Sequence, residues 1–266
     1  MSIGRPGIAA LWLVAACAQA QVNTITVAAM PALDAPPHER HKGDIKAHFV
    51  RLKSLVHPDR LANFQQDAQA QVSAQECQLI GEPKEPWPTD PDDRFLAYED
   101  HYITERFHVT YFQSRQAIGP CKLKWQTYRK VTIQSFNGTT CIVDLSRPQL
   151  SRSRPGCSIN VLEKAPAAPL PATLNLSKDQ HPHAGHVCRY IEPVAAMGDF
   201  AKLHRRCVMD IAAIEPRTTA PAAIRGLLLR SETRLDPNGR HVDIMEAQRV
   251  EPGVGITRGV LLPHLQ

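Results

Sequence analysis

The chain has 266 residues, of which 43% are hydrophobic and 21% are charged, and this composition excludes disorder of the whole chain. Its 31 basic and 26 acidic residues leave a net charge of +5, scattered along the sequence. Because a nucleic-acid-binding protein gathers its basic residues into one patch or stripe, we expect no nucleic-acid partner. We find no nucleotide-binding loop, zinc-protease helix, nucleophile elbow or coiled coil in the sequence.

Residues 1–20 have the pattern of a bacterial-type export signal peptide. Arg5 supplies the positive start, residues 8–17 are an apolar run too short to span a bilayer, and residues 18–20 form a small-x-small cleavage site. Residues 14–17 also resemble the lipobox of bacterial lipoproteins, so cleavage after Ala20 and a lipid anchor at Cys17 both stay open. No later stretch is apolar enough for a transmembrane span. We therefore expect a periplasmic or secreted protein, with an outer-membrane lipoprotein as the alternative.

Six cysteines follow the signal peptide, an even number that predicts up to three disulfides in an oxidising compartment. Six cysteines allow 15 pairings, and the sequence does not choose among them, although Cys121 and Cys157 are one candidate pair. The predicted disulfide cysteines are Cys77, Cys121, Cys141, Cys157, Cys188 and Cys207.

The first region of the mature chain, residues 21–97, combines a short strand, helices and a stiff connection. A strand and loose linker are expected over 21–43. Apolar residues then recur every three or four positions over 44–76, which predicts two amphipathic helices or one broken helix. Four prolines among acidic residues predict a stiff connection over 83–91.

Residues 98–145 are predicted to form a β-hairpin unit. Strands are expected at 106–112 and 121–133, because apolar and polar residues alternate there. Asn137-Gly138 is typical of a hairpin turn, and 141–145 is the expected return strand, with Cys141 opposite Gln134. A basic and Pro/Ala-rich linker then covers 146–180.

The last region, residues 181–266, is predicted to be a C-terminal β unit. Strands are expected at 188–191, 203–211, 226–235 and 240–246, and Asp236-Pro237-Asn238-Gly239 is the expected turn between the last two.

Three segments of this unit carry a family resemblance. They are 226–234 (GLLLRSETR), 244–254 (IMEAQRVEPGV) and 261–263 (LLP). Together they resemble the C-terminal strands of the periplasmic lipoprotein-carrier-like (LolA/LolB-like) half-barrel superfamily, which carry a G-L-P-L-R-x-E strand, an E-A-x-x-I strand and a terminal F-x-x-P. The segment bounded by Cys188 and Cys207 resembles a two-cysteine hairpin that precedes these strands in related exported families. The sequence departs from the pattern at Leu228, where the family has proline, at 261–262, where an aromatic residue is common, and in its unmatched N-terminal third.

The resemblance implies a curved antiparallel sheet or half-barrel whose concave face, covered by helices, holds an apolar ligand. We therefore expect a mainly β (α+β), disulfide-stabilised fold with the N-terminal helices packed on the sheet. The expected function is an exported, non-catalytic envelope protein that binds an apolar or lipid-like ligand or a partner envelope protein. Candidate ligand-lining residues are Trp125, Val131, Ile133, Leu227 and Leu229, with ordinary core packing as the alternative for each.

Histidines provide a competing hypothesis. His181, His183 and His186 lie within six residues, and neutral imidazole is a common ligand of zinc and other transition metals. A metal-binding exported protein or enzyme centred on these residues is the first alternative function, and a disulfide-stapled structural module is the second. Pairs such as Glu99 and Asp100 are interpreted as solvated turns, because catalysis needs carboxyl groups placed by the fold.

Overall fold

A computed structural model describes residues 35–39, 43–56, 73–86, 90, 95–119, 121–122, 124–135, 140–145, 175–192, 203–216, 223–234 and 242–261. All of them belong to one compact unit, Pro31–Gln266. The expected export signal at 1–20, the expected strand at 21–43 except its last few residues, and most of the expected linker at 146–180 lie outside the described residues.

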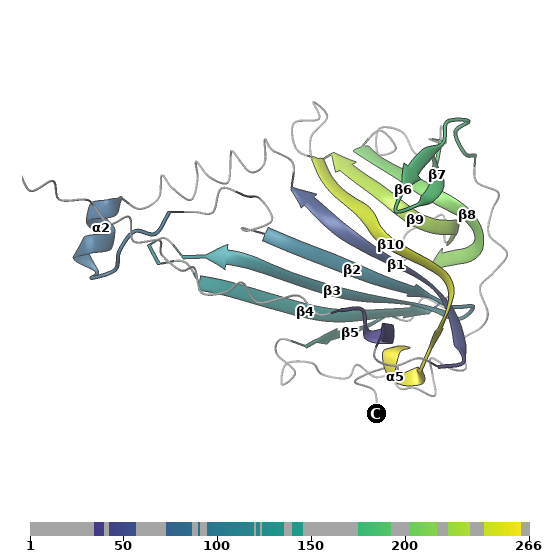
Figure 1. Cartoon of the computed structure of the whole chain (residues 1–266), viewed down its shortest axis with the longest axis horizontal. Helices are drawn as coiled ribbons and strands as arrows, with labels where there is room; N and C mark the ends of the chain where they lie inside the picture. Colours follow the sequence, from purple (N-terminus) through teal and green to yellow (C-terminus); the bar gives the residue numbers. More distant parts are fainter. Residues whose placement is uncertain are drawn as a thin grey trace, which may run out of the picture. The chain divides into compact units, whose positions relative to one another are not determined.

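Ten strands form one antiparallel sheet that holds most of the described chain (Figure 1). They are β1 (Ile45–Val56), β2 (Phe95–Ile103), β3 (Phe107–Ile118), β4 (Lys124–Ser135), β5 (Thr140–Asp144), β6 (His181–His183), β7 (His186–Tyr190), β8 (His204–Pro216), β9 (Ala223–Arg234) and β10 (Val242–Ile256). Short helical segments are η1 (Pro37–Glu39), α2 (Ala74–Leu79) and α5 (Arg258–Leu261). The prediction of a mainly β, antiparallel and disulfide-stabilised fold is confirmed.

The strands follow the order β5-β4-β3-β2-β1-β10-β9-β8-β7-β6. Strands β1 to β5 run outward as one meander, and β6 to β10 return toward β1 as a second (Figure 1). The two meanders join where β1 pairs with β10, from Ile45 opposite Ile256 to Val56 opposite Asp243. A barrel has no sheet ends, whereas within the described chain β5 and β6 end this sheet. The sheet is therefore open.

The sheet bends enough for strands far apart in its order to touch. β8 contacts β2 and β3, and β6 contacts β10. The pairing of β1 with β10 is interrupted by register shifts between Ala47 and Phe49 and between Arg51 and Leu52. Such bulges bend a strand and increase its twist, so they contribute to the curvature.

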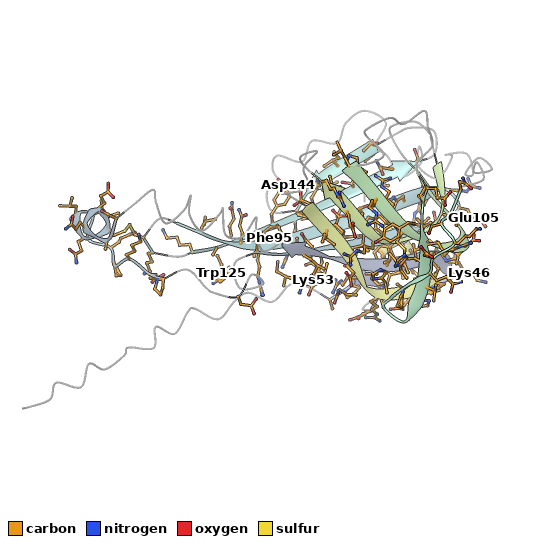
Figure 2. The ribbon with its side chains drawn as sticks, turned by 90° about the horizontal axis from the view of Figure 1, so that it is seen from above. Lys46, Lys53, Phe95, Glu105, Trp125 and Asp144 are labelled. Atoms are coloured by element: carbon orange, nitrogen blue, oxygen red, sulfur yellow. A yellow bond between two sulfur atoms is a disulfide. The ribbon has the colours of Figure 1, made fainter. Side chains whose placement is uncertain are left out.

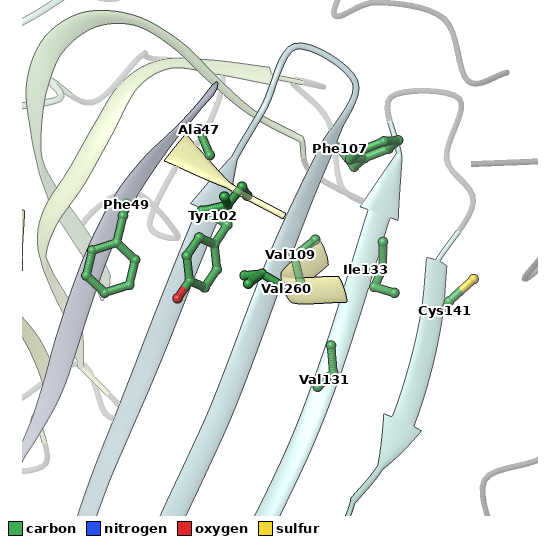
Figure 3. Packing of buried hydrophobic residues seen from close by; sticks show 10 residues of the cluster. Ala47, Phe49, Tyr102, Phe107, Val109, Val131, Ile133, Cys141 and Val260 are labelled. Atoms are coloured by element: carbon green, nitrogen blue, oxygen red, sulfur yellow. The ribbon is translucent and has the colours of Figure 1, made fainter. Parts of the chain in front are cut away.

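Buried apolar side chains form two clusters. The outer cluster (Figure 3) consists of Ala47, Phe49, Tyr102, Phe107, Val109, Val131, Ile133, Cys141, Ile256 and Val260. The inner cluster consists of Val50, Leu52, Ile103, Cys188, Cys207, Met209, Leu227, Leu229 and Ala247.

The two clusters lie on opposite faces of the central strands. Phe49 and Val50 are consecutive in β1 but belong to different clusters, and the same holds for Tyr102 and Ile103 in β2. Neighbouring residues of a strand point to opposite faces, so each strand is buried on both sides. Because Ile103 packs with residues of β8, we call its face of β1–β5 the inner face and the opposite face the outer face.

The helices predicted over 44–76 are wrong for the part that the structure describes. Residues Ile45–Val56 form β1, the central strand, and only Ala74–Leu79 are helical. The reason is burial on both faces, because the outer cluster takes Phe49 while the inner cluster takes Val50 and Leu52. Two buried faces and two bulges remove the simple alternation of a strand and leave apolar spacings that imitate a helix.

Most of the other predicted strands are confirmed, including 106–112, 121–133, 203–211 and 226–235 in large part. The predicted register of Cys141 is wrong by one residue, since Cys141 lies opposite Ile133 and Thr140 lies opposite Gln134. Five residues thus separate Gln134 from Thr140, an odd number that a two-residue turn at Asn137-Gly138 does not give. The turn residues of this hairpin and of the β9–β10 hairpin lie outside the described residues.

Two disulfides are described in full. Cys77 of α2 is bonded to Cys121, and Cys188 of β7 is bonded to Cys207 of β8. Cys141 is also disulfide-bonded, and the predicted disulfide cysteine Cys157 lies outside the described residues. The candidate pair Cys121–Cys157 is therefore wrong, because Cys121 ties the short helix α2 to the start of β4. These bonds indicate an oxidising, non-cytoplasmic environment.

Candidate functional site

A polar network with two buried histidines at its centre lies on the inner face of β2 and β3. It consists of Glu99, His101, His108 and Thr110, and we call it the histidine network. His101 lies opposite Thr110, and His108 lies opposite Ile103 of the inner cluster. Cross-strand partners share a face, so all four side chains lie on the inner face.

The hydrogen bonds of the network run in one direction, from His108 through His101 to Glu99. His101 Nε2 lies 3.0 Å from Glu99 Oε2, and His101 Nδ1 lies 2.7 Å from His108 Nε2. Since a carboxylate only accepts, His101 Nε2–H donates to Glu99 and the neutral His101 ring accepts at Nδ1 from His108 Nε2–H. Thr110 Oγ1 lies 3.3 Å from His108 Nε2. The chain therefore ends at His108 Nδ1, a lone pair that no group within the described ranges satisfies.

Burial controls the charge of this network. Burial lowers the pKa of His108 well below its usual value, and any positive charge on His101 lowers it further. Burial alone would raise the pKa of Glu99, but the hydrogen bond from His101, any positive charge on that ring and the charge of Lys130 outweigh it, so that pKa is lowered. His48, which lies opposite Ile103, also has a pKa lowered by burial. The structure thus favours a neutral His108 beside an ionised Glu99.

We expect acid to destabilise the protein through His108. Because the folded pKa is depressed below about 6.5, the unfolded chain binds more protons, so stability is complete above that pH and is lost as pH falls below it. Each pH unit below the unfolded pKa costs about 1.4 kcal/mol for such a group. Urea unfolding between pH 7.5 and pH 5 should show a shallower pH dependence in His108→Gln than in the parent. Equal slopes, or the same change in the control His186→Gln, would contradict this account.

The outer face of the same strands carries a second buried polar group. Arg51 Nε and Nη2 donate to the two carboxylate oxygens of Asp100, each at 2.6 Å. Asp100 is fully buried, and burial raises its pKa although the bonds and charge of Arg51 oppose this. The interpretation of Glu99 and Asp100 as a solvated turn is therefore wrong: both lie in the middle of β2.

The structure does not bring the five predicted ligand-lining residues together. Val131 and Ile133 belong to the outer cluster, whereas Leu227 and Leu229 belong to the inner cluster. Trp125 is half-buried near the α2 end of the β3–β4 hairpin, away from the strand ends at Lys46 and Glu105 (Figure 2). Four of the five are buried in the two clusters, and Trp125 belongs to neither.

The three predicted metal-binding histidines lie on the hairpin formed by β6 and β7. Ala184 and Gly185 make its turn with positive φ angles. His181 packs edge-on against the Tyr190 ring at 4.8 Å between centroids, while His183 Nδ1 lies 3.5 Å from Glu246. Among the described side chains, the group that could hold a metal ion combines His183 with Cys188 and Cys207, not with the other two histidines.

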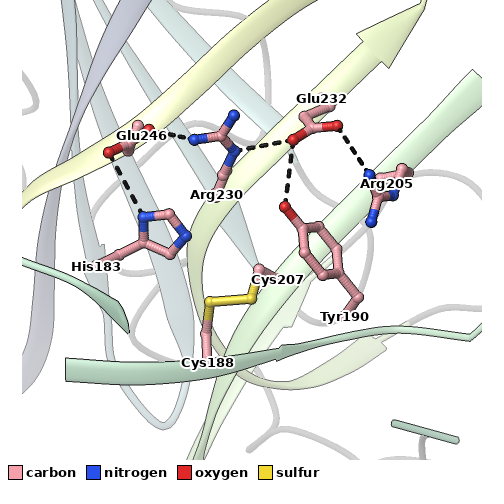
Figure 4. Close-up of polar contacts among 8 residues, drawn as sticks. All are labelled: His183, Cys188, Tyr190, Arg205, Cys207, Arg230, Glu232 and Glu246. Atoms are coloured by element: carbon pink, nitrogen blue, oxygen red, sulfur yellow. Dashed lines mark hydrogen bonds and ion pairs between the residues drawn. A yellow bond between two sulfur atoms is a disulfide. The ribbon is translucent and has the colours of Figure 1, made fainter. Parts of the chain in front are cut away.

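An ion-pair network surrounds this hairpin (Figure 4). Glu246 contacts both His183 and Arg230, and Arg230 Nε donates to Glu232 at 2.9 Å. Glu232 also accepts from the Tyr190 hydroxyl at 3.2 Å. The network links β6 and β7 to β9 and β10.

The histidine network was missed at the sequence level because its members come from two strands. Glu99 and His101 are two apart in β2, as are His108 and Thr110 in β3, which is the spacing of one strand face. Alternation of ionisable residues inside an apolar strand is the signal that could have identified them. Their mutual contact depends on the β2–β3 register, which one sequence does not supply.

No helix among the described residues has the length and apolar character needed to cross a membrane. Searches against protein-family models, curated proteins and solved structures gave no match to this chain.

Proposed function

We propose that this is an exported protein that binds an apolar or lipid-like ligand, without turnover, along the inner face of β3–β5. The disulfides and the expected signal peptide support export to the periplasm or beyond. The bent, open sheet supports ligand access, since β8 lies against β2 and β3 while β5 is an end of the sheet.

The observation that carries the proposal is a broken row of three apolar side chains left partly exposed on this face, interrupted by Lys130 and Thr132. Thr110 lies opposite Thr132, and Thr132 lies opposite Ile142 of β5, so Ile142 shares the face of His101. Ile142 is 53% exposed. Phe112 and Tyr128 are half-buried on the same face, with ring centroids 5.9 Å apart. Apolar surface of this kind gains about 25 cal/mol for each Å² that a ligand removes from water.

Polar groups beside this row would orient a ligand with a charged end. Lys130 lies opposite Phe112, and its ammonium group stands 5.9 Å from the centre of that ring. A cation beside an apolar strip suits a fatty acid. Lys130 also lies opposite Asp144 and near Glu99, so the fatty-acid carboxylate would share this cation with them while its chain covers Phe112 and Ile142. Deeper on the face, His108 Nδ1 offers a hydrogen-bond acceptor.

Binding of a dansyl-labelled fatty acid tests the proposal. Ile142→Asp places a charge in the strip and should raise the Kd by about tenfold or more, equivalent to about 1.4 kcal/mol. Ile80→Asp is the matched control, because Ile80 is 64% exposed beside α2 and lies outside the sheet.

Three results would overturn the proposal: no binding by the parent, equal binding by Ile142→Asp, or an equal loss in Ile80→Asp. Mass spectrometry of the recovered probe should find it chemically unchanged, and a converted probe would contradict binding without turnover.

A further inference from the structure

The Cys188–Cys207 disulfide lies beside an imidazole in an arrangement that suits a metal. The ligand atoms of His183, Cys188 and Cys207 all lie within 4.8 Å of one another. We propose that, once this disulfide is reduced, His183, Cys188 and Cys207 form a site for Zn²⁺. The inference is independent of the ligand proposed for the inner face of β3–β5.

Three neighbouring strands hold these ligands in place. His183 ends β6, Cys188 lies in β7 of the same hairpin, and Cys207 lies in β8. The Cα atoms of the two cysteines are 5.4 Å apart. Two zinc-bound sulfurs stand about 3.8 Å apart, because each Zn–S bond is about 2.3 Å in a tetrahedral site. Reduction would let the two sulfurs separate to that distance by rotation of the cysteine side chains.

The surroundings of His183 are those of a metal-binding histidine. Its Nδ1 lies 3.5 Å from Glu246 Oε1, which leaves Nε2 for the metal. A carboxylate on the second nitrogen orients such a ring and makes it a stronger ligand. Arg230 in turn holds Glu246, as Figure 4 shows. The His183 side chain is 11% exposed and both cysteines are buried, so the site is shielded but not sealed.

A dithiol can act as the reductant of the Cys188–Cys207 disulfide. The dithiol is oxidised to its disulfide while the Cys188–Cys207 bond takes up two electrons and two protons to give two thiols. Zn²⁺ then displaces both thiol protons, and neutral His183 supplies the third ligand. A water molecule would fill the fourth position, as in zinc sites with three protein ligands.

The second described disulfide provides an internal comparison. Cys77 and Cys121 are also buried, but no such three-ligand group forms around them in the described part of the chain. Of the two disulfides described in full, reduction should therefore give a zinc site at Cys188 and Cys207 and none at Cys77 and Cys121.

Zinc binding by the purified protein tests the proposal. After reduction with dithiothreitol, addition of Zn²⁺ and removal of the excess of both, mass spectrometry for metals should find about one Zn²⁺ per chain, and the oxidised protein should hold almost none. The variant Cys188→Ser/Cys207→Ser should lose this zinc, whereas Cys77→Ser/Cys121→Ser should keep it.

Histidine variants separate this site from unspecific thiol binding. His183→Ala should weaken zinc binding by about tenfold or more, and Glu246→Gln by about 10-fold to 100-fold, with His186→Ala unchanged. Co²⁺ substitution should give a thiolate-to-cobalt absorption band that depends on both cysteines. Absence of zinc in the reduced chain, equal affinity in His183→Ala, or loss of cooperative melting on reduction would overturn the proposal, because the ligands meet only in the fold.

Discussion

Arg51→Met is expected to destabilise the fold by about 3–5 kcal/mol, because it leaves the buried Asp100 carboxylate without its partner. Asp100 is fully buried in the structure and receives two hydrogen bonds from the guanidinium group of Arg51. Chemical denaturation at pH 7.5 would measure the loss. Arg249→Met is a matched control, since Arg249 lies opposite Arg51 in β10 but makes exposed ion pairs with Glu39 and Glu251. It should cost no more than about 1 kcal/mol.

The pH dependence of the Arg51→Met effect gives a second test. Arg51 lowers the pKa of Asp100 against the larger effect of burial, so its removal raises that pKa further. A carboxyl group with a raised folded pKa penalises the fold when ionised, and the penalty disappears as falling pH protonates it. The loss in Arg51→Met should thus be smaller at pH 5 than at pH 8. A loss that does not change with pH would mean that packing, not an unpaired charge, causes it.

Replacing both partners distinguishes the cost of leaving one buried charge unpaired from the contribution of the intact ion pair. In Arg51→Met/Asp100→Leu no buried charge remains, so most of the lost stability should return. If the double variant is as unstable as the single one, Arg51 acts through its other contacts instead.

Strands β7 to β10 of the second meander could be predicted in part because each has one clear signal, whereas no strand was expected at 181–183. Residues 226–235 and 240–246 flank a strong turn sequence, and the structure pairs Arg234 with Val242 as a hairpin requires. Local alternation and turn chemistry act within one hairpin, so they can be read from a single sequence.

The central strand could not be predicted in the same way. β1 is buried between the two clusters and pairs with β10, some 200 positions later in the chain, from Lys46 opposite Gly255 to Lys53 opposite Glu246. Its apolar residues point to both faces of the sheet, so their spacing along the sequence combines the patterns of two buried surfaces. Only knowledge of its partners would have distinguished this strand from a helix.

The contacts within the candidate site also depend on which strands pair and in which register, and a single sequence does not supply this. Of the predicted metal trio, His183 joins Cys188 and Cys207 in the described ligand group, while His181 is the cross-strand partner of Cys188. His101 and His108 meet because β2 and β3 pair in one register and not the next. A shift of this register by one residue would put the two histidines on opposite faces of the sheet.

Leu229, one of the predicted ligand-lining residues, belongs to the inner cluster. Leu229→Ala is expected to cost about 2–5 kcal/mol of folding stability, because the Leu229 side chain is fully buried in the inner cluster and its removal leaves a cavity. Thermal and urea unfolding would measure this loss. The surface comparison is Ile142→Ala, which truncates a side chain that is 53% exposed and should change stability by no more than about 0.5 kcal/mol.

Fatty-acid binding by the two alanine variants completes this prediction. If Leu229 is core and Ile142 contacts the ligand, Leu229→Ala should bind the dansyl-labelled probe as the parent does below its unfolding temperature, while Ile142→Ala should bind it more weakly. The opposite pattern, with a stable Leu229→Ala that no longer binds, would place the ligand inside the inner cluster. It would also reject the inner face of β3–β5 as the binding surface.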